Sequence, residues 1–123
     1  MKQVLLVFIG GGFGSAARYL LGKFLNPETG IPYGTFAANI LGSLIIGLIL
    51  GLAAKSDTLT QSQTLLLATG FCGGFTTFST FAYENQVFLK NGDFMMFALY
   101  TIASFSIALL AVFGGIYLSR VIV

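Results

Sequence analysis

Histidine is absent from this sequence of 123 residues, and cysteine occurs only once, as Cys72. A single cysteine cannot form a disulfide within the chain, and without histidine it has no imidazole partner for nucleophilic catalysis. The few acidic residues are scattered, so no cluster of metal-ligating side chains is evident. The sequence therefore argues against an enzyme, and we expect Cys72 to be a buried packing residue.

Charge is also scarce, because 8% of the residues are charged whereas 56% are hydrophobic, more than a soluble core of this size could bury. Three stretches without any charge exceed the roughly 20 residues that cross a bilayer, and a fourth with one charge reaches that length. They lie between Glu28 and Lys55, between Asp57 and Glu84, between Asp93 and Arg120, and, with Arg18, between Lys2 and Lys23. We predict one all-α membrane domain over residues 1–123, with four transmembrane helices and no nucleic-acid partner. The first stretch is too long for a secretory signal, so we expect it to be retained.

Positive residues are almost evenly divided between the two membrane faces that four spans would define. The division is Lys2, Lys55 and Arg120 on one face, against Lys23, Lys90 and, near the end of the first span, Arg18 on the other. Because orientation follows the Lys/Arg imbalance, the chain has no clear orientation and could insert both ways. We predict an antiparallel, dual-topology homodimer; a weakly biased single topology is the alternative. Glycine pairs four residues apart, such as Gly10 and Gly14, favour close helix packing.

Residues 70–81 of the third span combine the adjacent glycines Gly73 and Gly74 with four hydroxyl residues. Glycine weakens a helix, and hydroxyl groups can satisfy the backbone groups that an interruption exposes. We therefore predict that the third helix is broken in mid-membrane, where free carbonyls commonly coordinate ions; a continuous, flexible glycine helix is the alternative. Phe78 and Phe81 follow on one face, either as packing residues or as ring edges that meet an anion.

Polar side chains also mark the other spans. Asn39 lies on one face with Thr35 and Ser43, where its amide could donate to an anion or to a neighbouring helix. Tyr100 and Ser104 lie on one face of the last span, as a polar track or in ordinary interhelical bonds. Arg18 could attract anions at a pore mouth or extend to the headgroups, and we expect Glu84 to be interfacial.

The chain resembles the Fluc (CrcB) family of bacterial fluoride channels through four passages. They are residues 10–19, residues 34–43, the glycine and hydroxyl segment 70–81, and the stripe from Tyr100 to Ser104. The third passage is the most diagnostic. The resemblance implies a multi-pass protein of the bacterial plasma (inner) membrane, in which an antiparallel homodimer exports cytoplasmic fluoride passively through two pores.

The resemblance also implies roles for individual residues. Asn39 would donate to the anion, Phe78 and Phe81 would line its pathway, and the backbone carbonyls of Gly73 and Thr76 from both chains would hold a central structural sodium ion. The remaining predicted pathway residues are the hydroxyls Ser79, Thr80, Tyr100 and Ser104, with Arg18 in the vestibule. In some members the polar face continues one turn further, where this chain has Ala108, so we assign Ala108 no role.

Two other functions are alternatives to a fluoride channel. A small dual-topology multidrug exporter can share the four helices but needs a carboxylate within the membrane, whereas all four acids lie at or near the predicted span ends. A membrane scaffold that transports nothing does not explain why polar residues occur within three of the spans. The sequence therefore favours a fluoride channel.

Overall fold

The computed structural model describes residues 1–55 and 58–123, and its regular structure is entirely helical. The elements are α1 (Lys2–Leu25), α2 (Tyr33–Ala54), α3 (Gln61–Thr64), the π-helix η1 (Leu65–Cys72), α4 (Gly73–Phe75), α5 (Ser79–Lys90) and α6 (Phe94–Ile122). Four helical stretches are long and apolar enough to cross a membrane, namely Lys2–Leu25, Tyr33–Ala54, Gln61–Lys90 and Phe94–Ile122. The predicted all-α chain with four candidate spans is confirmed.

The third of these stretches is built from four elements that follow one another. Helical structure ends at Phe75 and resumes at Ser79, and Thr76 is extended, with φ −89° and ψ 157°. The sequence predicted an interruption around Gly73 to Thr76. Gly73 and Gly74 are instead helical, so the non-helical residues begin after both glycines. The π-helix Leu65–Cys72 before them was not predicted.

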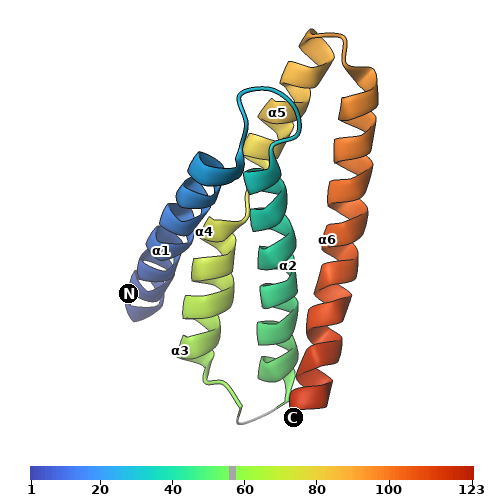
Figure 1. The fold of residues 1–123 in the computed structure, drawn as a ribbon. Helices are drawn as coiled ribbons and strands as arrows, with labels where there is room; N and C mark the ends of the chain where they lie inside the picture. The colour runs from blue at the N-terminus through green and yellow to red at the C-terminus, as the bar shows by residue number, and fades with distance from the viewer. Residues whose placement is uncertain (56–57) are drawn as a thin grey trace.

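The helices pack as two close pairs, with α1 against η1 and α4, and α2 against α6 (Figure 1). Glycine allows both approaches. A Cβ atom added at Gly10 or Gly14 would overlap backbone atoms of η1, and one added at Gly47 would overlap the backbone of Val112 on α6. The prediction that these glycines support close helix packing is confirmed within the chain.

Side chains at the helix ends replace the hydrogen bonds that a helix cannot make there. The Asn26 side-chain oxygen, just after α1, accepts from the backbone N–H groups of Gly34, at 2.6 Å, and Thr35, at 3.2 Å, at the start of α2. The α5–α6 turn is closed by Gly92, whose φ of +74° favours glycine. The Asn26 contacts thus connect the end of α1 to the first turn of α2.

Large apolar side chains cover much of the outer surface, and few are buried. Phe8, Phe13 and Phe105 are more than two-thirds exposed, whereas fully buried side chains include Cys72. The prediction that Cys72 is a buried packing residue is thus confirmed. Apolar side chains exposed on this scale suit a surface that meets lipid or another protein chain rather than water.

Adding a methyl group at Gly14 should destabilise the protein, because the methyl would overlap the Phe71 carbonyl and the Phe75 amide. We expect Gly14→Ala to cost about 1–3 kcal/mol, the usual range for overpacking. The measurement is the melting temperature of the purified protein in detergent. Gly12→Ala is the matched control, since nothing lies within 4 Å of its added Cβ. Equal melting temperatures for the two variants would contradict the packing described for α1.

Candidate functional site

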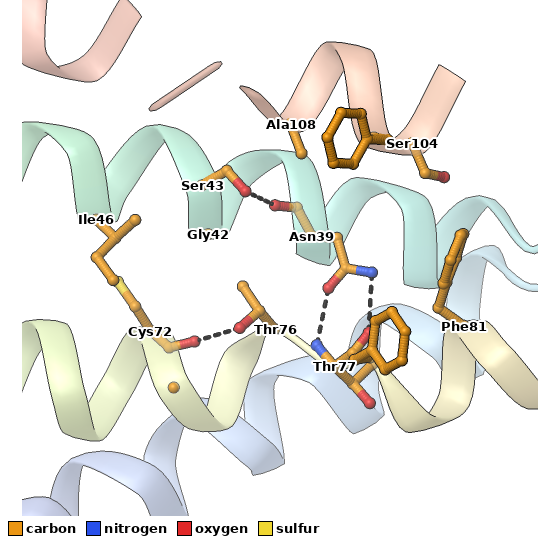
Figure 2. A pocket seen from close by; sticks show the side chains of 13 residues that line it. Asn39, Gly42, Ser43, Ile46, Cys72, Thr76, Thr77, Phe81, Ser104 and Ala108 are labelled. Atoms are coloured by element: carbon orange, nitrogen blue, oxygen red, sulfur yellow. Dashed lines mark hydrogen bonds between the residues drawn. The ribbon is translucent and has the colours of Figure 1, made fainter. Parts of the chain in front are cut away.

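A groove of about 340 Å³ lies between α2, the third helical stretch and α6 (Figure 2). It brings together residues that are far apart in the sequence. Its lining consists of Asn39, Gly42, Ser43, Ile46, Cys72, Gly73, Thr76, Thr77, Phe78, Phe81, Ser104, Phe105 and Ala108. Six of the predicted site residues therefore meet at one groove: Asn39, Gly73, Thr76, Phe78, Phe81 and Ser104.

The Asn39 side chain connects α2 to the non-helical segment. Its Oδ1 accepts the backbone N–H of Thr77 at 2.8 Å, and its Nδ2 donates to the carbonyl of Thr77 at 3.1 Å (Figure 2). Of the two roles considered from the sequence, the interhelical bond is therefore present. One of the two amide N–H groups has no bond to the described residues, so it remains able to donate into the groove.

The carbonyls next to the interruption differ in what they bind. The Cys72 carbonyl accepts the Thr76 N–H at 3.0 Å and the Thr76 hydroxyl at 2.9 Å. Among residues 1–55 and 58–123, no hydrogen bond ends on the carbonyls of Gly73, Phe75 or Thr76. Gly73 and Thr76 both line the groove, so two of these unbonded carbonyls belong to residues of its lining.

Arg18 reaches the same interruption from α1. Its Nε donates to the Gly74 carbonyl at 3.1 Å, and the Ser15 hydroxyl is 3.5 Å from the same oxygen. A positive charge near the last carbonyls of a helix is stabilising, because it offsets the negative end of the helix dipole. Arg18 thus stabilises the end of α4, and it is not among the groove-lining residues.

Aromatic rings form one wall of the groove. The rings of Phe78 and Phe81 are 6.0 Å apart between centroids, and Phe81 is 5.1 Å from Tyr100 by the same measure. Phe78 is 80% exposed in the single chain, whereas Phe81 is half-buried. Phe81 is therefore held by its neighbours, and Phe78 has a free surface that lipid or another chain can cover.

The Tyr100 hydroxyl donates to Glu84 rather than to the groove. Its distance to Glu84 Oε1 is 2.7 Å, and the Thr35 hydroxyl donates to Oε2 of the same carboxylate at 2.6 Å. Asn26 Nδ2 donates to Thr35 Oγ1 at 3.3 Å and extends the network to the α1–α2 loop. Glu84 is half-buried in this network, which sequence reasoning missed because these residues lie far apart in the sequence.

The other predicted hydroxyls have different environments. Thr80 donates its backbone N–H to Thr77 Oγ1 at 3.2 Å, and Ser79 Oγ is 3.4 Å from that hydroxyl; neither residue lines the groove. Ser104 does line it, and its buried Oγ has no hydrogen-bond partner among the described residues. Ala108 lies one turn further along the same wall (Figure 2). Ser104 is therefore a groove-lining residue whose hydroxyl is buried and has no hydrogen bond within the described chain.

Together, four candidate spans and a groove of neutral donors, aromatic rings and unbonded carbonyls define a small α-helical membrane protein whose polar site lies between its helices. The chain belongs to the family described as "CrcB-like protein, Camphor Resistance (CrcB)", which it matches over residues 5–116. It is 52% identical over 123 residues to a protein of Gloeothece citriformis, with 98% of both chains covered. It is 46% identical to one of Chlorobaculum tepidum, with 98% of this chain and 96% of the relative covered. Both relatives are named "Fluoride-specific ion channel FluC".

Removing the Tyr100 hydroxyl should destabilise the protein, because it leaves one oxygen of the half-buried Glu84 carboxylate without its donor. We expect Tyr100→Phe to cost about 1–3 kcal/mol, measured by thermal unfolding in detergent. Tyr117→Phe is the control, since Tyr117 is 66% exposed on the same helix. Unchanged stability with reduced ion flux would instead assign the hydroxyl to the ion pathway alone.

Proposed function

We propose that the chain is a subunit of a fluoride-selective channel that exports cytoplasmic fluoride passively across the bacterial plasma (inner) membrane. The relatives named fluoride-specific ion channels support this function over nearly the whole chain. The observation that carries the proposal is the meeting of Asn39, Phe78, Phe81 and Ser104 at one groove, although they come from three different spans. Passage of an ion requires no covalent step, so we propose no enzymatic activity.

The groove suits a small, strongly hydrated anion. Removing water from such an ion without replacement costs far more than a protein can supply, whereas a fixed opposite charge would hold the ion too tightly to release it. Asn39 offers one free N–H, Ser104 offers its hydroxyl, and the ring edges of Phe78 and Phe81 carry partial positive charge. These neutral groups replace part of the hydration shell and still let the ion leave.

Passive export follows from the acid chemistry of fluoride. Neutral hydrogen fluoride crosses lipid from an acidic exterior and dissociates in the more neutral cytoplasm, where the anion is trapped. A selective pore then lets the anion leave down its own gradient without any energy source. The cell is thus protected by a channel alone.

We propose that the working unit is an antiparallel, dual-topology homodimer with two pathways, in which the segment 76–78 lies in mid-membrane. The near balance of positive charge between the faces supports dual insertion. The Phe78 ring and many other large apolar side chains are exposed in the single chain, which supports a partner chain. One chain by itself encloses little of the groove. A second copy would complete the walls of each pathway.

We further propose that the Gly73 and Thr76 carbonyls of both subunits hold a structural sodium ion. The residues fit this ion, because sodium is a hard cation that takes oxygen ligands, and unwound backbone carbonyls commonly supply them. Both carbonyls are free of hydrogen bonds in the described chain. When bound, the ion would supply a positive charge that offsets the carbonyl dipoles gathered at the subunit interface.

A proton-coupled multidrug exporter is the alternative, and Glu84 is the residue on which it would depend. Both carboxylate oxygens of Glu84 already accept hydrogen bonds from Thr35 and Tyr100. Glu84 does not line the main groove. Neither observation favours exchange of protons for a cationic drug, so the channel remains the better explanation.

Purified protein in liposomes should pass fluoride and nearly exclude chloride, because hydrogen-bond donors and ring edges interact more strongly with a small anion of high charge density than with the larger chloride ion. We expect Phe78→Ile or Phe81→Ile to lower fluoride flux severalfold to about tenfold, the scale of a lost ring-edge interaction. Fluoride and chloride electrodes measure both fluxes. Phe113→Ile, exposed and away from the groove, is the control. Equal efflux of the two anions would overturn the selectivity proposal.

Dual insertion predicts that the C-terminus lies on both sides of the membrane. A reporter active only in the cytoplasm and one active only outside it, each fused after Val123, should both give signal in the same host. Adding two lysines near Lys55 should bias the signal toward the cytoplasmic reporter, because positive loops stay inside. Signal on one side alone for the unaltered chain would exclude dual topology.

A further inference from the structure

We infer that Asn39 is a positioning residue for the cation site, because its side chain takes the N–H that the Gly73 carbonyl would otherwise accept and sets the direction of the Thr76 carbonyl. The inference rests on the proposed function and extends it, since Asn39 was assigned only to the anion pathway. It makes one amide responsible for two sites, the anion groove and the carbonyls of the interruption.

The first step concerns the peptide group between Thr76 and Thr77. The described peptide bonds include no cis bond, and in a trans peptide the C=O and N–H point in opposite directions. Asn39 Oδ1 accepts the Thr77 N–H at 2.8 Å. The Thr76 carbonyl, at the other edge of the same plane, must therefore point away from Asn39 Oδ1. Fixing the donor fixes the direction of the carbonyl.

The second step concerns the partner that Thr77 would otherwise choose. In a continuous α-helix the N–H of Thr77 donates to the carbonyl four residues earlier, which is that of Gly73. Asn39 takes this N–H, so the Gly73 carbonyl is left without a partner in the described chain. Without the Asn39 amide, the Thr77 N–H could donate to the Gly73 carbonyl, which would then no longer be free to bind sodium. The Thr76 carbonyl would point along the helix axis, as in a regular helix.

The second contact of Asn39 strengthens this effect. Nδ2 donates to the Thr77 carbonyl at 3.1 Å, so the residue is held at both its N–H and its C=O. The Thr76 side chain does not compete for this role, since its hydroxyl donates back to Cys72. Of the described side chains, only that of Asn39 bonds to the Thr77 backbone.

The test compares how variants of the dimer respond to sodium, measured as the rise in melting temperature in detergent as sodium replaces N-methylglucamine. We expect Asn39→Ala to shift the midpoint of this rise to roughly tenfold higher sodium, the scale of losing a paired hydrogen bond. Asn39→Asp keeps an acceptor for the Thr77 N–H, so its midpoint should be no higher than that of the unaltered protein. Ser43→Ala is the matched control, because Ser43 donates only to the Asn39 carbonyl of its own helix.

Fluoride flux is measured on the same proteins to separate the two roles. Asn39→Asp should lose flux while keeping its response to sodium, because it loses the amide donor and adds a negative charge. An Asn39→Ala midpoint within about twofold of the unaltered protein would overturn the inference, as would a midpoint for Asn39→Asp as high as that for Asn39→Ala. Normal flux with no response of the unaltered protein to sodium would refute the inference and leave the channel proposal intact.

A measurement on the unaltered protein decides the matter if Asn39→Ala does not form a dimer. Cation binding at the Thr76 carbonyl and donation by the Thr77 N–H use the same peptide group, so each should strengthen the other. Hydrogen exchange of the Thr77 amide should therefore slow severalfold in sodium. An equal exchange rate in sodium and in N-methylglucamine would overturn the inference.

Discussion

The backbone around the interruption of the third span imposes the constraint on which the site depends. Where a helix stops among apolar residues, its freed N–H and C=O groups need partners that lipid cannot supply. Side chains of two other helices meet this need, with Arg18 of α1 at the Gly74 carbonyl and Asn39 of α2 at Thr77. The close packing of α1 and α2 around this segment is therefore a condition for the interruption.

Satisfying the backbone also shapes the chemistry of the groove. The groups that stabilise the segment from the sides of α1 and α2 leave the carbonyls of Gly73 and Thr76 and one N–H of Asn39 unbonded. Residues with unbonded carbonyls and a residue with a free amide donor thus line one groove, and none of the lining residues carries a formal charge. In this way the carbonyls can bind a cation while the Asn39 N–H, which belongs to the same hydrogen-bonded network, binds an anion nearby.

The fold could be predicted from the sequence further than the site could. Stretches with little or no charge located the four candidate spans. This signal is local, because hydrocarbon excludes charge from a span whichever other helices the span packs against. The π-helix Leu65–Cys72, which packs against α1, was not predicted, because its residues are mostly ordinary apolar ones with no spacing that distinguishes a π-helix from an α-helix. Likewise, spacing identified Asn39 and Tyr100 as polar positions on apolar helices. It could not give their partners, Thr77 and Glu84, which lie on another span.

The distribution of bonded and free donors limits how the proposed pathway can work. Tyr100, Thr77 and Thr35 have hydroxyls engaged within the chain, so they could contact an anion only by giving up or sharing those bonds. The buried Ser104 hydroxyl and one N–H of Asn39, both on groove-lining residues, have no hydrogen bond within the described chain. Two donors and two ring edges replace only part of the water around a fluoride ion. A pathway built from this chain therefore binds its ion weakly, which favours rapid release, and needs retained water or a second chain to complete the shell.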